Sequence, residues 1–211
     1  MKDLYIIGAG GFGREAAWLA ERVNTVEPVW NIKGFIDDDR ALQGTLQGAY
    51  PVVGGCDVLL GMVQETWAVC AIGCAGTRKK IVGKLESNPR IRFATLVDPE
   101  AVCSGRVSVG EGSILCAGTI LTVNISIGRH AIINLGCTIG HDAKIGDFVT
   151  IYPGANVSGQ AVVGERVELG TGMQVLQGIH ICAGCIVGAG AVVVRDITEE
   201  GTYVGVPARR L

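Results

Sequence analysis

Hydrophobic residues recur at every sixth position through the second half of this 211-residue chain. An amphipathic helix repeats about every 3.6 residues and a strand about every 2, so neither explains a period of six. A short fixed period is typical of a solenoid, in which each unit buries its apolar side only against its neighbours. The repeating positions, all Val, Leu or Ile, are Val109, Leu115, Leu121, Ile127, Ile133, Ile139, Ile145, Ile151, Val157, Val163, Leu169, Val175, Ile181, Val187 and Val193.

A second column supports the same register. Four residues after each aliphatic comes a small or medium side chain, so each hexad predicts a short strand and a corner with two inward side chains. This is the pattern of a parallel β-helix with three strands per coil, and it predicts roughly five coils stacked about 4.8 Å apart. Directly after the aliphatic, where we expect a tight turn with positive φ, stand Gly110, Gly128, Gly140, Gly146, Gly164, Gly170 and Gly188.

The first part of the chain has a different pattern. A short apolar run, residues 4–7, precedes a glycine-rich turn, and residues 14–23 follow with helical periodicity. Further apolar runs at 34–37, 68–72 and 91–96 predict three more strands. We therefore expect a small Rossmann-like parallel α/β domain over residues 1–96 and the β-helix with a C-terminal tail over residues 97–211.

The glycine-rich turn carries candidate chemistry. Gly8, Gly10 and Gly13 have G-x-G-x-x-G spacing between a strand and a helix, which lets backbone amides approach a diphosphate at the helix N-terminus. Asp37 and Asp38 follow the second strand, where an acid commonly accepts hydrogen bonds from a ribose or base. The domain is short for a full dinucleotide fold, which favours a nucleotide-linked substrate over NAD. A tight strand-to-helix turn without a ligand remains the alternative.

A basic run, Thr77-Arg78-Lys79-Lys80, follows the third strand at the start of a predicted helix. Thr77 is a candidate N-cap. The run is compatible with a phosphate contact and equally with a solvated helix face.

Composition narrows the class of protein. A net charge of −2 and a pI of about 5.9 argue against a nucleic-acid or anionic-membrane surface. The mean hydropathy of +0.39 is high, but the apolar runs are short and interrupted, so we expect no membrane span. With no signal peptide evident, we expect a cytoplasmic protein whose eight cysteines are reduced thiols. The segment 180–185 holds one histidine and two cysteines, but Cys185 points inward by register, so we expect no metal.

The chain has three histidines, and one of them has an acid beside it. His141 falls outside both inward columns, so its imidazole should lie on the outer surface of the solenoid, next to Asp142. Acyl transfer from a thioester needs a base near neutral pKa, and a neighbouring carboxylate can orient that base and stabilise its charged form. His130 and His180 are interpreted as surface or packing residues.

The hexads resemble those of the hexapeptide-repeat acyltransferases. More closely, nearly the whole chain resembles the branch that contains the sialic acid O-acetyltransferases and the nucleotide-amino-sugar N-acetyltransferases. The resemblance rests on the 8–13 turn, the Asp37-Asp38 pair, the His141-Asp142 pair, Pro153-Gly154-Ala155 and the closing 205–209 segment.

The resemblance implies a left-handed β-helix and a homotrimer with acetyl-CoA in the groove between neighbouring prisms. It implies His141 as general base supported by Asp142, with the Gly159 amide near the thioester carbonyl. Residues implied to contact the pantetheine arm are Gly188, Ala189 and Gly190. Residues implied to contact the nucleotide sugar are Gly8, Gly10, Gly11, Phe12, Gly13, Asp37, Asp38 and Gly73.

Two positions depart from relatives of that branch. Thr150 stands where several relatives have a second histidine near the cofactor; it can donate a hydrogen bond but cannot titrate. Phe12 stands where some amino-sugar relatives have histidine. Both departures bear on the identity of the acceptor more than on the type of reaction.

The favoured function is therefore transfer of an acetyl group from acetyl-CoA to the amino group of a UDP-type amino sugar. O-acetylation of a sialic acid or related sugar is the close alternative. Two further alternatives from other classes are a β-helix carbonic anhydrase, which needs three histidines on a metal, and a non-catalytic scaffold that binds nucleotide sugars.

Overall fold

A computed structural model describes residues 1–211, which divide into two compact units, Met1–Pro99 and Glu100–Leu211. Each unit is described by itself. None of the helices combines the length and the apolar character needed to cross a membrane.

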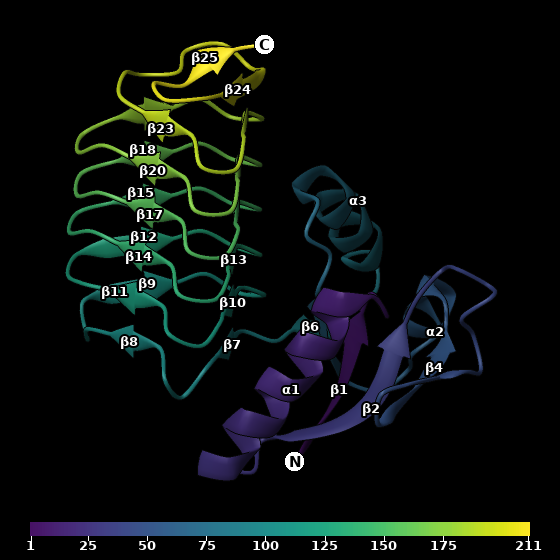
Figure 1. Cartoon of the computed structure of the whole chain (residues 1–211). Helices are drawn as coiled ribbons and strands as arrows, with labels where there is room; N and C mark the ends of the chain where they lie inside the picture. The colour runs from purple at the N-terminus through teal and green to yellow at the C-terminus, as the bar shows by residue number, and fades with distance from the viewer. The chain divides into compact units, whose positions relative to one another are not determined.

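The first unit is built on a six-stranded sheet with the order β3-β4-β2-β1-β5-β6 (Figure 1). Its strands are β1 (Lys2–Ile7), β2 (Trp30–Ile36), β3 (Leu46–Gln47), β4 (Tyr50–Gly54), β5 (Thr66–Cys70) and β6 (Ile91–Phe93), and only β3 runs antiparallel to its neighbour. Its helices are α1 (Gly11–Val26), α2 (Cys56–Leu60) and α3 (Ala75–Leu85). Because β2 and β5 lie on opposite sides of β1, the strand order reverses at β1, which is the usual ligand-binding place in such sheets.

The predicted α/β fold is confirmed, with local differences. The hairpin of β3 and β4 and the short helix α2 were not foreseen, because residues 38–62 have no clear hydrophobic period. The strand expected over 91–96 is two strands, since β6 ends at Phe93 and β7 (Leu96–Val97) follows it.

The second unit is a left-handed parallel β-helix, in which strands of successive coils lie one above another (Figure 1). Strands pair with those eighteen residues further on, as Ile120 does with Thr138. One face holds β8 (Val102–Cys103), β11 (Ile120–Leu121), β14 (Thr138–Ile139), β17 (Asn156–Val157), β20 (Gln174–Val175) and β23 (Val192–Val193). A second holds β9 (Val107–Val109), β12 (Ile125–Ile127), β15 (Lys144–Ile145), β18 (Val162–Val163) and β21 (His180–Ile181). The third holds β10 (Ile114–Leu115), β13 (Ile132–Ile133), β16 (Thr150–Ile151), β19 (Glu168–Leu169) and β22 (Ile186–Val187).

The two predicted inward columns form the core of the solenoid. All members are buried except Val109 and Ile179, which are partly exposed near the ends of the prism. Cys137 and Cys185 are fully buried in the column of smaller residues, and all eight cysteines are free thiols. The six-residue period therefore works as expected: each coil buries its apolar side chains against the coils next to it.

The corners differ from the prediction. Positive φ occurs three residues after every repeating aliphatic except Val193, and not one residue after it, so the expected conformation of the glycines that directly follow the aliphatics was wrong. Those glycines are required by close stacking instead: a Cβ on Gly140 would lie 2.5 Å from the backbone nitrogen of Gly159 in the next coil. Most residues with positive φ are glycines; the others are Asn124, His130, Asp142, Phe148, Gln160 and Arg166.

The C-terminal residues close the solenoid. β24 (Thr202–Val204) continues the third face by pairing with β22, and β25 (Arg209–Arg210) returns antiparallel to β24. A solenoid needs such a cap, because its last coil would otherwise expose the apolar column.

Candidate active site

The corner between β14 and β15 holds the predicted catalytic pair. The Nδ1 atom of His141 lies 2.9 Å from Oδ2 of Asp142, and the two side chains are 49% and 47% exposed. The prediction that His141 faces outward is confirmed. Its ring is held by the carboxylate and remains open to a ligand on the outside of the prism.

The charge of Asp142 determines which nitrogen of His141 carries the proton. Hydrogen bonds from His141 and, to a smaller extent, Asn124 lower the pKa of Asp142 below its ordinary value of 3.8, so near neutral pH it is a carboxylate and accepts only. Nδ1 must then be the donor in this pair. In the neutral imidazole Nε2 is left with its lone pair, as a general base requires.

Gly159 lies one coil beyond His141 in the same corner. A Cβ on Gly159 would lie 2.6 Å from Nε2 of His141 and 2.7 Å from Cε1. The imidazole therefore occupies space that any other residue at 159 would fill. This places one predicted cofactor-contacting residue directly against the predicted base.

The other predicted cofactor-contacting residues lie elsewhere in the chain. Thr150 begins β16 on the third face of the prism and is only 1% exposed. Gly188, Ala189 and Gly190 form the corner between β22 and β23. Within one chain, therefore, Gly159 alone among them adjoins His141.

The remaining two histidines have different surroundings. His130 is fully buried, and its ring stacks on Phe148 at a centroid distance of 5.1 Å. His180 begins β21 and is exposed, with its backbone N–H donated to Asp196 Oδ1 at 2.9 Å. No group of three His, Cys, Asp or Glu side chains is arranged to hold a metal ion.

A cavity of about 450 Å³ lies in the first unit at the carboxyl ends of β1, β2 and β5. Of the residues expected to contact the nucleotide sugar, Gly8, Asp37 and Asp38 line this cavity, whereas Gly10, Gly11, Phe12, Gly13 and Gly73 do not. The other lining residues are Ile7, Ile36, Cys56, Ile72, Thr77, Lys80 and Ile81. The cavity sits where the strand order reverses, which is where open α/β sheets bind their ligands.

The glycines of the turn have distinct steric roles. Gly8 has φ +101°, and a Cβ on Gly13 would lie 1.9 Å from the Gly8 carbonyl oxygen. Both positions therefore require glycine for the fold itself. A Cβ on Gly10 would have no atom within 4 Å, so that position is open for the approach of a ligand to the start of α1.

The two acids are already bonded to backbone amides. Asp37 accepts from the N–H of Ala9 at 2.9 Å and of Asp39 at 3.0 Å, so it ties the glycine turn to the end of β2. Asp38 accepts from the N–H of Cys56 at 2.7 Å. Each carboxylate oxygen has a further lone pair for a ligand donor.

The residues of the basic run have different roles: some are structural, and one lines the cavity. α3 begins at Ala75 with Cys74 as N-cap, so the prediction of Thr77 as N-cap was wrong. Arg78 is fully buried and donates to the Gly73 carbonyl at 3.0 Å, which makes it a structural residue. Lys80 is exposed and lines the cavity, where it supplies a positive charge.

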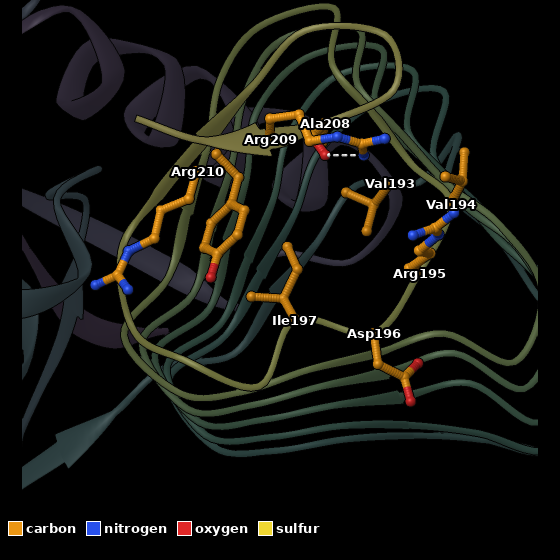
Figure 2. Close-up of a pocket in the computed structure, with 9 residues that line it drawn as sticks. Val193, Val194, Arg195, Asp196, Ile197, Ala208, Arg209 and Arg210 are labelled. Carbon is orange, nitrogen blue, oxygen red and sulfur yellow. Dashed lines mark hydrogen bonds between the residues drawn. The ribbon is translucent and has the colours of Figure 1, made fainter.

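A second cavity, of about 200 Å³, lies at the C-terminal end of the solenoid. Figure 2 shows the apolar side chains of Val193 and Ile197, which line it, with Ala208 and Arg209 above them in this view. The guanidinium of Arg209 turns back to donate to the Ala208 carbonyl at 2.9 Å. We interpret this cavity as the capped end of the apolar column.

Two residues near the sites were missed from the sequence. Asn124 donates from Nδ2 to Oδ1 of Asp142 at 3.1 Å, and its position eighteen residues before Asp142 was the available signal. Cys56 lies in the wall of the first cavity, where burial and the nearby Asp38 raise the pKa of its thiol to about 11. No pattern in the sequence pointed to Cys56.

The first unit of the chain matches a known protein family. Residues 3–85 match the family model described as the PglD N-terminal domain. No curated protein sequence matches the chain.

Several solved structures match over the whole length. The acetyltransferase domain of PglB from Neisseria gonorrhoeae FA1090 is 30% identical, with a TM-score of 0.90 and 100% of both chains covered; it is also known in complex with acetyl coenzyme A. WeeI from Acinetobacter baumannii AYE is 33% identical, with a TM-score of 0.89 and 100% of both chains covered. A perosamine N-acetyltransferase from Caulobacter crescentus, a variant with one histidine replaced by asparagine, was solved with CoA and GDP-perosamine. It is 30% identical, with a TM-score of 0.89, and the match covers 100% of this chain and 97% of that one.

Proposed function

The chain belongs to the PglD-like hexapeptide-repeat sugar acetyltransferases, and from that premise we propose that it moves the acetyl group of acetyl-CoA to the amino group of a nucleotide-linked amino sugar. The observation that carries the proposal is the pair of His141 and Asp142 at an exposed corner, with Nδ1 bonded at 2.9 Å and Nε2 left to accept a proton. The cavity at the carboxyl ends of β1, β2 and β5 supports the nucleotide part.

In the proposed reaction the sugar nitrogen attacks the thioester carbonyl carbon while Nε2 of His141 takes a proton from that nitrogen. The tetrahedral intermediate then collapses, the carbon–sulfur bond breaks, and the proton on Nε2 neutralises the departing CoA thiolate. Asp142 stabilises the imidazolium during this cycle through its hydrogen bond to Nδ1. The products are an N-acetylated sugar and free CoA.

The neighbouring Gly159 suits the developing oxyanion. Its carbonyl accepts from the N–H of Gly178 at 2.9 Å as part of the corner ladder. We assign its amide N–H to the thioester oxygen, because a backbone donor placed against the base needs no side chain to be reorganised.

We propose that a second copy of the chain completes the cofactor site, in a homotrimer. Thr150 and the Gly188–Gly190 corner lie on other parts of the prism than His141, so one chain alone does not surround a CoA molecule at the base. Light scattering tests this directly: a trimer has three times the chain mass of 22.0 kDa, and a monomer would contradict the proposal.

The nucleotide diphosphate is assigned to the start of α1. Gly10 caps the helix without a side-chain bond, the first turn contains no acidic residue, and Gly10 leaves room for a ligand. Asp37 and Asp38 are assigned to the ribose or base, and Lys80 to phosphate. The sequence favoured a UDP sugar; the GDP-perosamine complex of the Caulobacter relative makes a GDP sugar the second candidate.

The decisive experiment incubates the protein with acetyl-CoA and a panel of UDP- and GDP-linked amino sugars and measures CoA by chromatography. Thiol reagents are unsuitable because Cys74 and Cys103 are exposed. We expect CoA release with at least one amino sugar and an N-acetylated product by mass spectrometry. Acetylation of a sugar hydroxyl instead would support the sialic acid O-acetyltransferase alternative, and nucleotide-sugar binding without any turnover would support the scaffold.

A pair of glycine variants separates ligand binding from folding. Gly10→Ala should lower nucleotide-sugar affinity about tenfold or more while leaving the free energy of unfolding within about 1 kcal/mol, because its Cβ would meet no atom of the chain within 4 Å and would enter the space that we assign to the diphosphate. Gly13→Ala should destabilise the fold by more than about 2 kcal/mol through the clash with Gly8. If Gly10→Ala binds the nucleotide sugar as tightly as the parent chain does, the diphosphate does not bind at this turn.

A further inference from the structure

Asn124 occupies the corner position directly beneath Asp142, one coil earlier. Both residues have left-handed backbone conformations, with φ of 56° and 61°, and the N–H of Asp142 donates to the Val123 carbonyl at 3.0 Å. The two side chains therefore leave the same corner in the same direction. Asn and Asp adopt this conformation more readily than other non-glycine residues, so the local sequence favours the arrangement.

The two oxygens of Asp142 have different partners. Oδ1 accepts from Nδ2 of Asn124 at 3.1 Å, and Oδ2 meets Nδ1 of His141 at 2.9 Å. The three side chains thus form a continuous chain of hydrogen bonds from one coil to the next. The Asp142 side chain is 47% exposed, and besides His141 itself the Asn124 amide is the hydrogen-bond partner that restricts rotation of its carboxylate.

We propose that Asn124 is a positioning residue for acetyl transfer: its amide fixes the plane of the Asp142 carboxylate, which in turn orients the ring of His141 with Nε2 toward the acceptor. This inference rests on the proposed function of the His141–Asp142 pair. Asn124 acts through Asp142 and does not touch the reacting atoms. It adds a third member to the site that the adjacent pair in the sequence does not reveal.

The competing interpretation is a purely structural ladder of amides along this corner. Further along it Nε2 of Gln177 donates to Oε1 of Gln160 at 3.4 Å, without contact to a charged group. Gln160 also has a left-handed conformation, with φ of 61°. It is therefore a matched control for Asn124, with the same backbone and an amide side chain but a different partner.

The test is a double-mutant cycle in the full-length protein with the best sugar from the panel. Asn124→Gly removes the amide while glycine accepts the φ of 56° without strain. We expect kcat to fall about three- to tenfold with KM for both substrates unchanged. In an Asp142→Gly background, the same change should have no further effect on kcat, because the residue through which it acts is gone. Gln160→Gly should keep the parent kcat.

A second variant guards against misfolding. Asn124→Asp keeps the shape of the side chain and its tolerance of the left-handed conformation, but it places a carboxylate against Asp142 instead of a donor. We expect kcat at neutral pH to be at least as low as for Asn124→Gly.

Three results would overturn the inference. An equal loss of kcat from Asn124→Gly in both backgrounds would make its role structural. If both Asn124 variants keep the parent kcat while Asp142→Gly is impaired, Asn124 has no positioning role, but the proposed function still stands. Parent-like kcat in Asp142→Gly would remove the inference together with the proposed catalytic pair.

Discussion

Two corners of the solenoid carry a histidine, and they differ in what lies one coil further on. Eighteen residues after His130 comes Phe148, whose ring stacks on the imidazole at 5.1 Å and 13°. Eighteen residues after His141 comes Gly159, which has no side chain and leaves the imidazole 49% exposed. The same residue type therefore serves packing at one corner and is open for chemistry at the other.

The two histidines also occupy different positions in their hexads. His130 is itself the left-handed residue of its corner, with φ of 53°, whereas at the other corner this position belongs to Asp142, with φ of 61°. The left-handed position at the His141 corner is thus filled by the acid that is hydrogen-bonded to Nδ1 of His141. A histidine in such a solenoid is a candidate base when its neighbours one residue and one coil away leave it accessible and paired, and the spacing alone does not show this.

The largest effect is expected from removing His141, the proposed base. His141→Ala should lower kcat about 10²- to 10⁴-fold, because proton transfer from the acceptor loses its general base. The free energy of unfolding should change by less than about 0.5 kcal/mol, since the side chain is half exposed. Steady-state rates of CoA release and a denaturant titration measure the two quantities. A parent-like kcat in His141→Ala would show that neither histidine corner takes part in catalysis.

The second prediction concerns Gly159, the residue whose missing side chain distinguishes the His141 corner from the His130 corner. Gly159→Ala places a methyl group 2.6 Å from the original position of Nε2, so the ring of His141 must move. We expect kcat to fall about 10- to 100-fold with little loss of stability, because the displaced group is the end of a side chain. Gly105→Ala is the control, since its Cβ would have no atom within 4 Å. Unchanged kcat in Gly159→Ala would show that the ring position is not critical.

The third prediction concerns the packed corner. His130→Ala should lower the free energy of unfolding by about 2–3 kcal/mol, because it removes a fully buried ring that stacks on Phe148. The kcat of the folded protein should remain that of the parent chain. His180→Ala, at an exposed position, should change stability by less than about 0.5 kcal/mol. If His130→Ala loses kcat without losing stability, His130 has a catalytic role and not a packing role.

The smallest effect is the pH dependence of stability at the His141 corner. The pKa of Asp142 is lowered in the folded state, first by the hydrogen bond from His141, so its contribution to stability is present above its unfolded pKa of about 4. That contribution is lost as the pH falls through the lower folded pKa. Asp142→Asn should therefore be slightly less stable than the parent at pH 6, and the difference should shrink below about pH 4. Urea titrations at several pH values check this; a difference that grows toward acid pH would contradict the sign.

Much of the molecule could be predicted from local patterns. The six-residue column predicted the core of the solenoid and the outward direction of His141. The glycine spacing after residues 4–7 predicted the turn of the first unit. The corner conformations were predicted wrongly, because glycine is required for two different physical reasons. Gly140 is needed for close stacking on Gly159, while positive φ falls on residues such as Asp142. Sequence spacing does not separate a steric requirement between coils from a conformational one within a coil.

By itself, the sequence determined the period, the inward columns and the adjacency of His141 to Asp142, because these depend on neighbours in the chain and on side-chain alternation. Only the tertiary structure decided which residues eighteen positions apart meet across coils. It brought Gly159 of the next coil against His141, Asn124 of the previous coil against Asp142, and Phe148 onto His130. The reason is that stacking contacts between coils depend on the direction each side chain takes from its corner, which follows from backbone φ at that corner and not from residue type alone.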